Sequence, residues 1–210
     1  ILPLHTVRRM ILTFALPQQH SHYRSKPLIV LSHILGDEGE GGLLHFYKTK
    51  NWATSLSAGG GIEGSNFKDF NINLQLTDEG IKYADEVITA IFSYIQLIKE
   101  NGIASWRIKE TANLNQLMSD FPEQAKAIDQ ASHFSHSMFE YPPQHLIAGD
   151  YILDKPSIDI ILQMLDFFCP KNMRIKTVNP LVKTTHKAKW YHTPYSVERI
   201  ESVRLKSFLN

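Results

Sequence analysis

Cysteine is nearly absent from this sequence, and its scarcity excludes several kinds of site. Cys169 is the single cysteine among 210 residues, so the chain can form neither an internal disulfide nor a zinc cluster built on cysteine ligands. It lies in the apolar run ILQMLDFFCP, where we expect a buried, unreactive thiol. No apolar run approaches the ~20 residues that a helix needs to cross a bilayer.

An excess of charge of one sign is also missing. The chain has 22 Lys and Arg residues against 21 Asp and Glu residues. Surfaces that bind nucleic acids or anionic membranes are rich in clustered basic residues, and we identify no such cluster along the sequence. We therefore expect neither a nucleic acid nor a membrane as a partner.

The common catalytic signatures are lacking as well. The sequence has no G-x-S-x-G nucleophile motif, and AGGGIEGSNF lacks the Lys-Ser/Thr pair that ends a phosphate-binding loop. Neither H-x-x-E-H nor H-E-x-x-H occurs anywhere in the 210 residues. The sequence therefore predicts no catalytic residues and no metal ligands of its own.

What the sequence does contain is clear hydrophobic periodicity. Isoleucines recur at three- and four-residue steps in a helix that Thr77 caps and that continues to Asn101, and Pro27 opens another helix that ends near Gly36. Alternating apolar residues predict strands over Arg8–Leu16, Trp52–Ala58, Phe67–Leu76 and Met173–Val178. Strands with one apolar face, separated by pairs of helices, indicate an α+β fold in which helices cover one face of an antiparallel sheet.

The domain organisation follows from the absence of repeats and linkers. We find no internal repeat, no low-complexity tract and no flexible linker, so we expect one domain over residues 1–210, with a core of about residues 8–200 and a tail at 201–210. The chain begins at Ile1 rather than at Met, which suggests a piece of a longer protein.

The stretch HILGDEGEGG, residues 33–42, gathers residue types that bind metals or transfer protons. His33, Asp37 and Glu38 form a metal site only if the backbone holds them together, and the glycines around them disfavour a rigid helix at about 1 kcal/mol each. The other interpretation is the end of a helix whose acids lie in solvent. The histidine pairs His20/His22 and His133/His136 supply too few ligands for zinc, and we expect them to face solvent.

Three consecutive glycines, residues 59–61, end the strand that begins at Trp52. Glycine in a strand often marks the close approach of another backbone. An edge without obstructing side chains can accept an extended peptide as an added strand. A plain turn or β-bulge explains the glycines equally well, so both interpretations stay open.

Three stretches together resemble one enzyme family. LSHILGDEGEGGLLHFYKTKNWATSLSAG, FNINLQLTDEGIKYADEVITAIFSYIQLIKENG and WYHTPYSVERI are similar to the insulinase/pitrilysin-type zinc metallopeptidases. Within that family, the stretches resemble specifically the inactive second domain of the N-terminal half. It runs from about Arg8 to Ile200, and its specific feature is H-x-x-G-x-E-G-x-G-x-L-L followed by K-x-x-x-W.

The resemblance implies that the catalytic residues and the zinc of the parent enzyme lie in a different domain from this one. Zinc is expected in a catalytic domain with an H-x-x-E-H motif, outside this chain, and no cofactor is expected here. If His33 takes the last position of that motif, Ile29 and Ser32 stand where the family's catalytic domain has its other histidine and its glutamate. This chain alone is therefore expected to be inactive, while the parent is expected to be a zinc metalloendopeptidase.

The resemblance also implies a binding role. The related domain helps to enclose a degradation chamber, and it carries an exosite that anchors the amino end of a peptide substrate. Position by position, the family's exosite corresponds to His33, Gly36, Glu38, Leu56, Ala58 and Gly60. Glu38 offers a carboxylate to the ammonium group, and the strand from Leu56 to Gly60 offers backbone acceptors.

The expected partners are peptide substrates and the catalytic and C-terminal domains of the same parent chain. Two rival functions remain open. One is an autonomous hydrolase that uses His33, Asp37 or Glu38. The other is a structural interaction domain resembling a processing-peptidase core subunit, with no peptide-anchoring role. Bacterial members of the family are often periplasmic, so the resemblance favours that location for a bacterial source, with the cytoplasm as the alternative.

Overall fold

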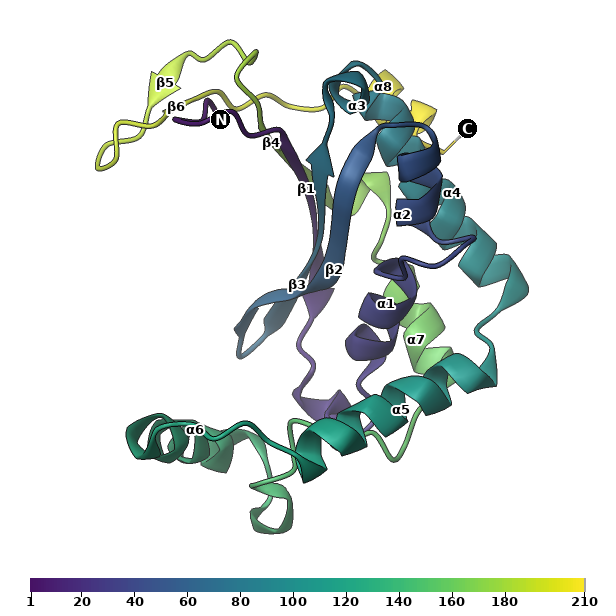
Figure 1. The fold of residues 1–210 in the computed structure, drawn as a ribbon, viewed down its shortest axis with the longest axis vertical. Helices are drawn as coiled ribbons and strands as arrows, with labels where there is room; N and C mark the ends of the chain where they lie inside the picture. Colours follow the sequence, from purple (N-terminus) through teal and green to yellow (C-terminus); the bar gives the residue numbers. More distant parts are fainter. Residues whose placement is uncertain (210) are drawn as a thin grey trace.

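The computed structural model describes residues 1–209 and shows a four-stranded sheet with helices packed on one of its faces (Figure 1). All neighbouring strands are antiparallel, and their order across the sheet is β2-β3-β1-β4. The strands span Arg9–Pro17 (β1), Ala53–Gly64 (β2), Phe67–Leu76 (β3) and Met173–Val178 (β4). The predicted α+β class is confirmed, and β2 extends six residues beyond its predicted end at Ala58.

The alternation of apolar residues in β1 and β3 determines which face of the sheet is buried. Leu12 lies opposite Ile72, and Phe14 lies opposite Phe70. These four side chains are fully buried. Because successive residues of a strand point to opposite faces, the residues between them lie on the other face, which the helices leave uncovered (Figure 1).

Four helices form the layer over the apolar face: α1 (Pro27–Leu35), α2 (Leu43–Thr49), α4 (Ala84–Asn101) and α7 (Ile158–Leu165). Both α1 and α2 contact β2, and α7 contacts α1. The first helix begins at Pro27 and is capped at its end by Gly36, as predicted. The layer therefore places the C-terminal end of α1 beside the edge strand β2.

The helix predicted over residues 77–101 is interrupted. Thr77 caps its start by accepting a hydrogen bond from the Gly80 N–H, but α3 (Asp78–Lys82) ends at Tyr83, where α4 begins. The Tyr83 ring stacks on Trp52 with centroids 5.3 Å apart. A single-helix prediction was wrong here because contacts with Trp52, a residue distant in sequence, bend the chain.

The remaining elements lie around this core. On the left of Figure 1, α6 (Ala127–Glu140) and the hairpin formed by β5 (His186–Lys187) and β6 (Pro194–Tyr195) project on the side of the uncovered sheet face, below and above it. No helix among residues 1–209 has both the length and the apolar character needed to cross a membrane. The remaining elements around the core are α5 (Ser105–Asp120), α6 (Ala127–Glu140), α8 (Ser202–Ser207), the 3-10 helices η1 (His20–His22), η2 (Pro143–His145) and η3 (Pro170–Asn172), and the short strands β5 (His186–Lys187) and β6 (Pro194–Tyr195).

Cys169 is half-buried, so the prediction of a buried thiol was only partly right. It lies between the end of α7 and η3, and its neighbours Phe168 and Pro170 are the residues that enter the core.

Candidate functional site

The end of α1 lies directly against β2, and Gly36 allows that approach. A β-carbon at Gly36 would lie 2.8 Å from the Ser32 carbonyl oxygen and 3.9 Å from the Ala58 backbone nitrogen. One at Gly59 would lie 3.7 Å from the Ser32 Oγ. The structure therefore brings together Gly36 and the Ala58–Gly59 segment, which lie more than twenty positions apart in the sequence.

Asp37 does not lie free in solvent, contrary to the expectation for the acids of this stretch. Its carboxylate accepts a hydrogen bond from the Gly39 N–H at 2.8 Å and forms an ion pair with Arg107 of α5 at 2.8 Å. The Gly39 N–H and then the Arg107 guanidinium lower the pKa of the Asp37 carboxyl group below its usual value. Asp37 thus fastens the loop after α1 to α5.

His33 faces α5 as well. Its Nε2 lies 3.6 Å from a carboxylate oxygen of Glu110, while its Nδ1 is buried without a hydrogen-bond partner among residues 1–209. The side chain is only 28% exposed. His33 therefore lies at the α1–α5 contact, and its nearest carboxylate comes from α5 rather than from Asp37 or Glu38.

Glu38 is the exposed acid of the site. Its side chain is 68% exposed, and its carboxylate lies 3.8 Å from the Lys48 Nζ of α2. No hydrogen bond or ion pair in the described part of the chain joins Glu38 to β2. The carboxylate is thus accessible to a ligand, and Lys48 forms an exposed ion pair with it.

Leu56, Ala58 and Gly60 lie on the helix-covered side of β2. They pair with Leu74, Ile72 and Phe70 of β3 in register, and those partners are buried core residues. The side chains of Leu56 and Ala58 therefore serve packing, and what these positions offer a ligand is backbone. A β-bulge between Gly60 and Glu63 shows that the glycines also accommodate an irregularity.

The backbone of β2 is paired on one side only. The strand lies at the edge of the sheet and pairs with β3. Within residues 1–209, no backbone hydrogen bond outside the β2–β3 ladder involves residues 55–64. In an antiparallel edge strand the N–H and C=O groups of every second residue point away from the sheet, so this edge presents free donors and acceptors.

The residues at the inverted-motif positions do not fit a zinc ion. Ile29 has no ligand atom, the Ser32 hydroxyl donates to the Leu28 carbonyl at 2.7 Å, and the His33 imidazole faces Glu110. Residues 1–209 contain no group of three or more His, Cys, Asp and Glu side chains arranged to hold a metal. The three inverted-motif positions therefore lack the ligand set that the zinc of the family's catalytic domain requires.

The two histidines of α6 are exposed, as expected. They do have carboxylate neighbours: His133 lies 3.0 Å from Asp150, and His136 lies 3.0 Å from Glu140, four residues later on the same helix. The Tyr141 hydroxyl donates to the same Asp150 at 2.8 Å. Burial and then this hydrogen bond raise the pKa of Tyr141.

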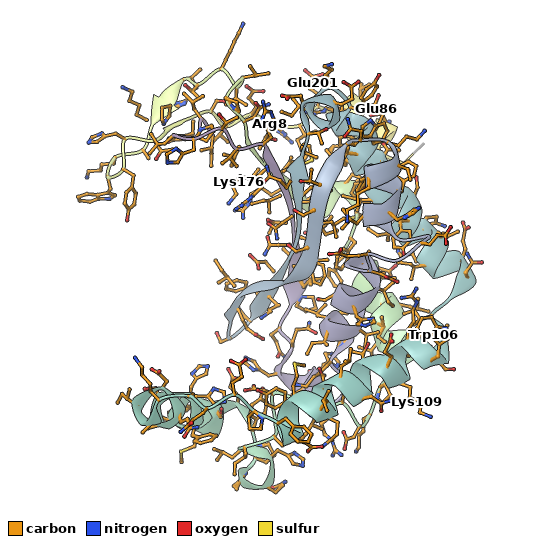
Figure 2. The ribbon with its side chains drawn as sticks, in the orientation of Figure 1. Arg8, Glu86, Trp106, Lys109, Lys176 and Glu201 are labelled. Carbon is orange, nitrogen blue, oxygen red and sulfur yellow. The ribbon has the colours of Figure 1, made fainter. Side chains whose placement is uncertain are left out.

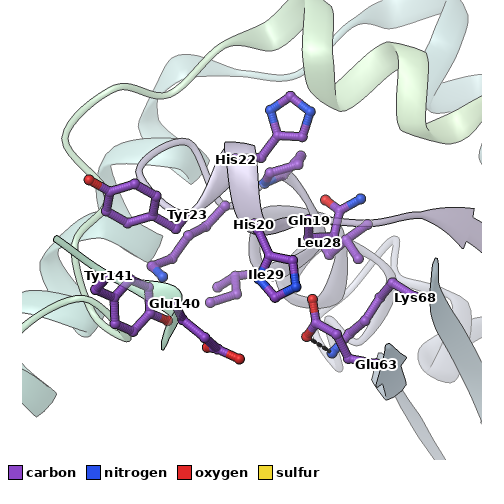
Figure 3. A pocket seen from close by; sticks show the side chains of 12 residues that line it. Gln19, His20, His22, Tyr23, Leu28, Ile29, Glu63, Lys68, Glu140 and Tyr141 are labelled. Atoms are coloured by element: carbon purple, nitrogen blue, oxygen red, sulfur yellow. Dashed lines mark hydrogen bonds and ion pairs between the residues drawn. The ribbon is translucent and has the colours of Figure 1, made fainter. Parts of the chain in front are cut away.

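A cavity of about 170 Å³ lies near these groups, between η1, the start of α1, the β2–β3 hairpin and the end of α6 (Figure 3). Its charged side chains already have partners in the protein. Lys68 pairs with Glu63 at 2.7 Å, and Lys26 donates to the Gly149 carbonyl at 2.9 Å. Burial lowers the pKa of Lys26.

The structure also shows a group of basic residues that we missed in the sequence. Arg174 and Lys176 of β4 are exposed, as are three lysines in and around the β5–β6 hairpin. The signal was present, because residues 167–197 hold six Lys and Arg residues and no Asp or Glu. A balanced total charge concealed it, and the statement that no basic cluster exists was wrong.

Known protein families match this chain in two segments. The description "Peptidase M16 inactive domain" covers residues 3–115, and "Middle or third domain of peptidase M16" covers residues 120–210. The chain belongs to the M16 peptidase family. The division between the two M16 segments falls within α5, yet the second segment supplies β4 to the sheet of the first. One domain over the whole chain stays a prediction, which this shared sheet supports.

Individual M16 proteins are also similar to this chain in sequence. A nardilysin-like protein of Arabidopsis thaliana is 35% identical over 205 residues, which are 95% of this chain and 20% of the relative. Human insulin-degrading enzyme is 32% identical over 213 residues, which cover 100% of this chain and 21% of the enzyme. The chain thus spans about a fifth of the length of these relatives.

Solved structures share the fold. Pitrilysin superposes with a TM-score of 0.91 at 23% identity, over 99% of this chain and 22% of that chain. A peptidase M16 inactive domain from Pseudomonas fluorescens superposes with a TM-score of 0.58 at 16% identity, over 85% of this chain and 42% of that one. The predicted insulinase/pitrilysin resemblance is confirmed. The chain is a non-catalytic part of an M16 metallopeptidase, and zinc belongs to the family's catalytic domain.

Proposed function

We propose that this chain helps to enclose the degradation chamber of an M16 zinc metalloendopeptidase and anchors the amino end of peptide substrates there. The observation that carries the proposal is the unpaired edge of β2 beside the loop that presents Glu38. An extended peptide pairs with such an edge through main-chain hydrogen bonds. Its ammonium terminus needs a carboxylate and carbonyl acceptors, and this place offers both.

Each of the six anchor residues has a distinct part in this proposal. Glu38 receives the ammonium group, and the backbone of Leu56, Ala58 and Gly60 pairs with the first residues of the peptide. Gly36 keeps the end of α1 close to Ala58, where a larger residue would meet the Ser32 carbonyl. His33 holds α1 against α5 near Glu110 and so positions the loop that carries Glu38.

The uncovered sheet face suits the role of a chamber wall. It carries Thr13, Asn71, Asn73 and Gln75 of β1 and β3, and α6 and the β5–β6 hairpin project on either side of it (Figure 1). The partners of this wall are the catalytic and C-terminal domains of the parent chain. The parent is expected to be a zinc metalloendopeptidase, with this chain supplying no group to the chemical step.

A second candidate function, a purely structural interaction domain, also has a specific observation in its favour. Large apolar side chains are exposed just after α5 and on α6, with Phe121 75% exposed and Phe139 90% exposed. Exposed apolar groups of this size favour contact with other protein surfaces. Both functions can belong to one domain, and only peptide anchoring requires a free amino end on the ligand.

Replacing Glu38 by Gln should weaken peptide affinity by roughly ten- to a hundredfold, because a hydrogen bond to a charged group contributes about 1.5–3 kcal/mol. The measurement is binding of a labelled, non-cleavable peptide to the full-length enzyme. Acetylating the amino end of the peptide should cause a similar loss. The two losses should not add, since each removes the same interaction.

Glu40→Gln is the matched control, since Glu40 is an exposed acid two residues away with no ion pair in the described chain. It should leave the affinity within about twofold of wild type, a difference below ~0.5 kcal/mol. Unchanged affinity in Glu38→Gln, with acetylated and free peptides binding equally, would rule out the anchor. In that case the structural interaction domain becomes the better account.

A further inference from the structure

Three basic side chains lie together on the sheet face that the helices leave uncovered. Across β1 and β4, Arg9 pairs with Val178, Ile11 with Lys176 and Thr13 with Arg174. Directly paired residues of antiparallel strands point to the same face, and Leu12 and Phe14 point to the buried one. Arg9, Arg174 and Lys176 therefore share the uncovered face, where Figure 2 shows Lys176 on the side away from the helices.

The β5–β6 hairpin extends this basic surface. Lys183, Lys187 and Lys189 are exposed in and around it. The hairpin is joined to the sheet end by a hydrogen bond from the Leu2 N–H to the Pro194 carbonyl at 3.0 Å. The Lys189 ammonium lies 5.1 Å from the centre of the Trp190 ring, whose side chain is also exposed. We call Arg9, Arg174, Lys176, Lys183, Lys187 and Lys189 the basic face.

The basic face has no counter-charge of its own. None of its six residues has a carboxylate within 4.0 Å among residues 1–209, whereas Arg8, Arg24, Arg107 and Arg204 each have one. On the uncovered side of the sheet, β1–β4 carry one acid in the described residues, Asp69, which accepts a hydrogen bond from Asn71. Like charges left unpaired on one surface produce a positive potential that attracts an anionic ligand.

We propose that the basic face binds an acidic stretch of the peptide whose amino end is anchored at β2. This inference rests on the proposed function, since it places both contacts on one peptide. The arrangement favours a peptide because the same face carries Asn73 and Gln75, whose amides can donate to and accept from a peptide backbone. The total charge of +1 provides little attraction for a long polyanion.

The spacing of the strands sets where the acidic residues must lie in the peptide. Neighbouring strands are about 4.8 Å apart. A peptide added outside β2 therefore lies roughly 14 Å from β1 and roughly 19 Å from β4. At about 3.3 Å per extended residue, four to six residues are needed to cross from the anchor to the basic face. With some five residues paired to β2, an acidic block centred roughly ten residues from the amino end can reach it.

The test compares two non-cleavable peptides on the full-length enzyme, identical except for three Glu or three Gln residues centred on position ten. The Glu peptide should bind more tightly in wild type. The double substitution Arg174→Gln/Lys176→Gln should weaken binding of the Glu peptide by roughly two- to thirtyfold, since exposed ion pairs contribute about 0.2–1 kcal/mol each. The Gln peptide should bind both proteins equally, and about 1 M salt should abolish the preference for Glu.

Lys50→Gln/Lys109→Gln is the matched control, because it removes two exposed lysines from the helix side of the molecule, where Figure 2 labels Lys109. It should leave the preference for Glu unchanged. Equal binding of the Glu and Gln peptides to wild type would overturn the basic-face proposal, as would an equal loss in the control. So would a single-stranded oligonucleotide that binds this face more tightly than the Glu peptide.

The two proposals fail separately. If Glu38→Gln has no effect but the preference for Glu persists and requires Arg174 and Lys176, the anchor is wrong. The basic face then binds acidic peptide, but not a peptide whose amino end is held at β2. If Glu38→Gln weakens both peptides equally and no preference exists, the anchor stands and the basic face is wrong.

Discussion

Replacing Ile91 by Ala should lower the free energy of unfolding by about 2–5 kcal/mol. Ile91 is 0% exposed in the middle of α4, on the same face as Ile88 and Ile95, which are also buried. Truncating it removes buried apolar surface and leaves a cavity that the surrounding helices and sheet can fill only in part. Urea denaturation of the 210-residue chain measures the change.

Leu97→Ala is the control for this prediction, since Leu97 lies on the same helix but is 51% exposed. Its expected cost is within about 0.5 kcal/mol, as for other surface positions. A cost below that value for Ile91→Ala as well would show that the isoleucine stripe does not face the core.

Replacing Gly80 by Ala should destabilise the chain by about 3 kcal/mol or more, toward the upper end of the cost of overpacking. A β-carbon at Gly80 would lie 1.9 Å from the carbonyl oxygen of Trp52. That neighbour is backbone and cannot rotate away. In an ordinary helix the same change would be favourable by about 1 kcal/mol, so the sign of the effect identifies the close contact.

Gly59→Ala provides the comparison, because a β-carbon there meets only the Ser32 Oγ, at 3.7 Å. We expect a change within about 0.5 kcal/mol, measured by the same denaturation. A Gly80→Ala variant as stable as wild type would mean that Trp52 does not pack against α3, and the position of the start of β2 would then need revision.

Local patterns were sufficient to predict most of the fold. β3 alternates polar and apolar residues from Asp69 to Leu76, and Pro27 and Gly36 bound α1, so both elements could be assigned from local sequence. The break between α3 and α4 at Tyr83 could not be predicted from local sequence, because it depends on Trp52, more than thirty positions earlier. The extension of β2 to Gly64 likewise depends on pairing with β3 rather than on its own glycine-rich sequence.

The candidate site could be predicted only in part for a similar reason. The sequence indicated which acids cluster after α1, but not which of them would be neutralised. Arg107, seventy positions away, forms an ion pair with Asp37, while Glu38 stays exposed. The basic face was missed because the balanced total charge concealed the acid-free segment 167–197, which supplies all its members but Arg9. Arg9 joins them only when β1 pairs with β4.

Amide hydrogen exchange of the full-length enzyme, free and saturated with a non-cleavable peptide, tests the anchoring role of β2 most directly. If the peptide adds to the edge strand, outward-pointing amides within Leu56–Gly60 gain a hydrogen-bond partner and should exchange more slowly in the complex. That protection should weaken when the amino end of the peptide is acetylated. Unchanged exchange across Leu56–Gly60 in the saturated complex would contradict the account.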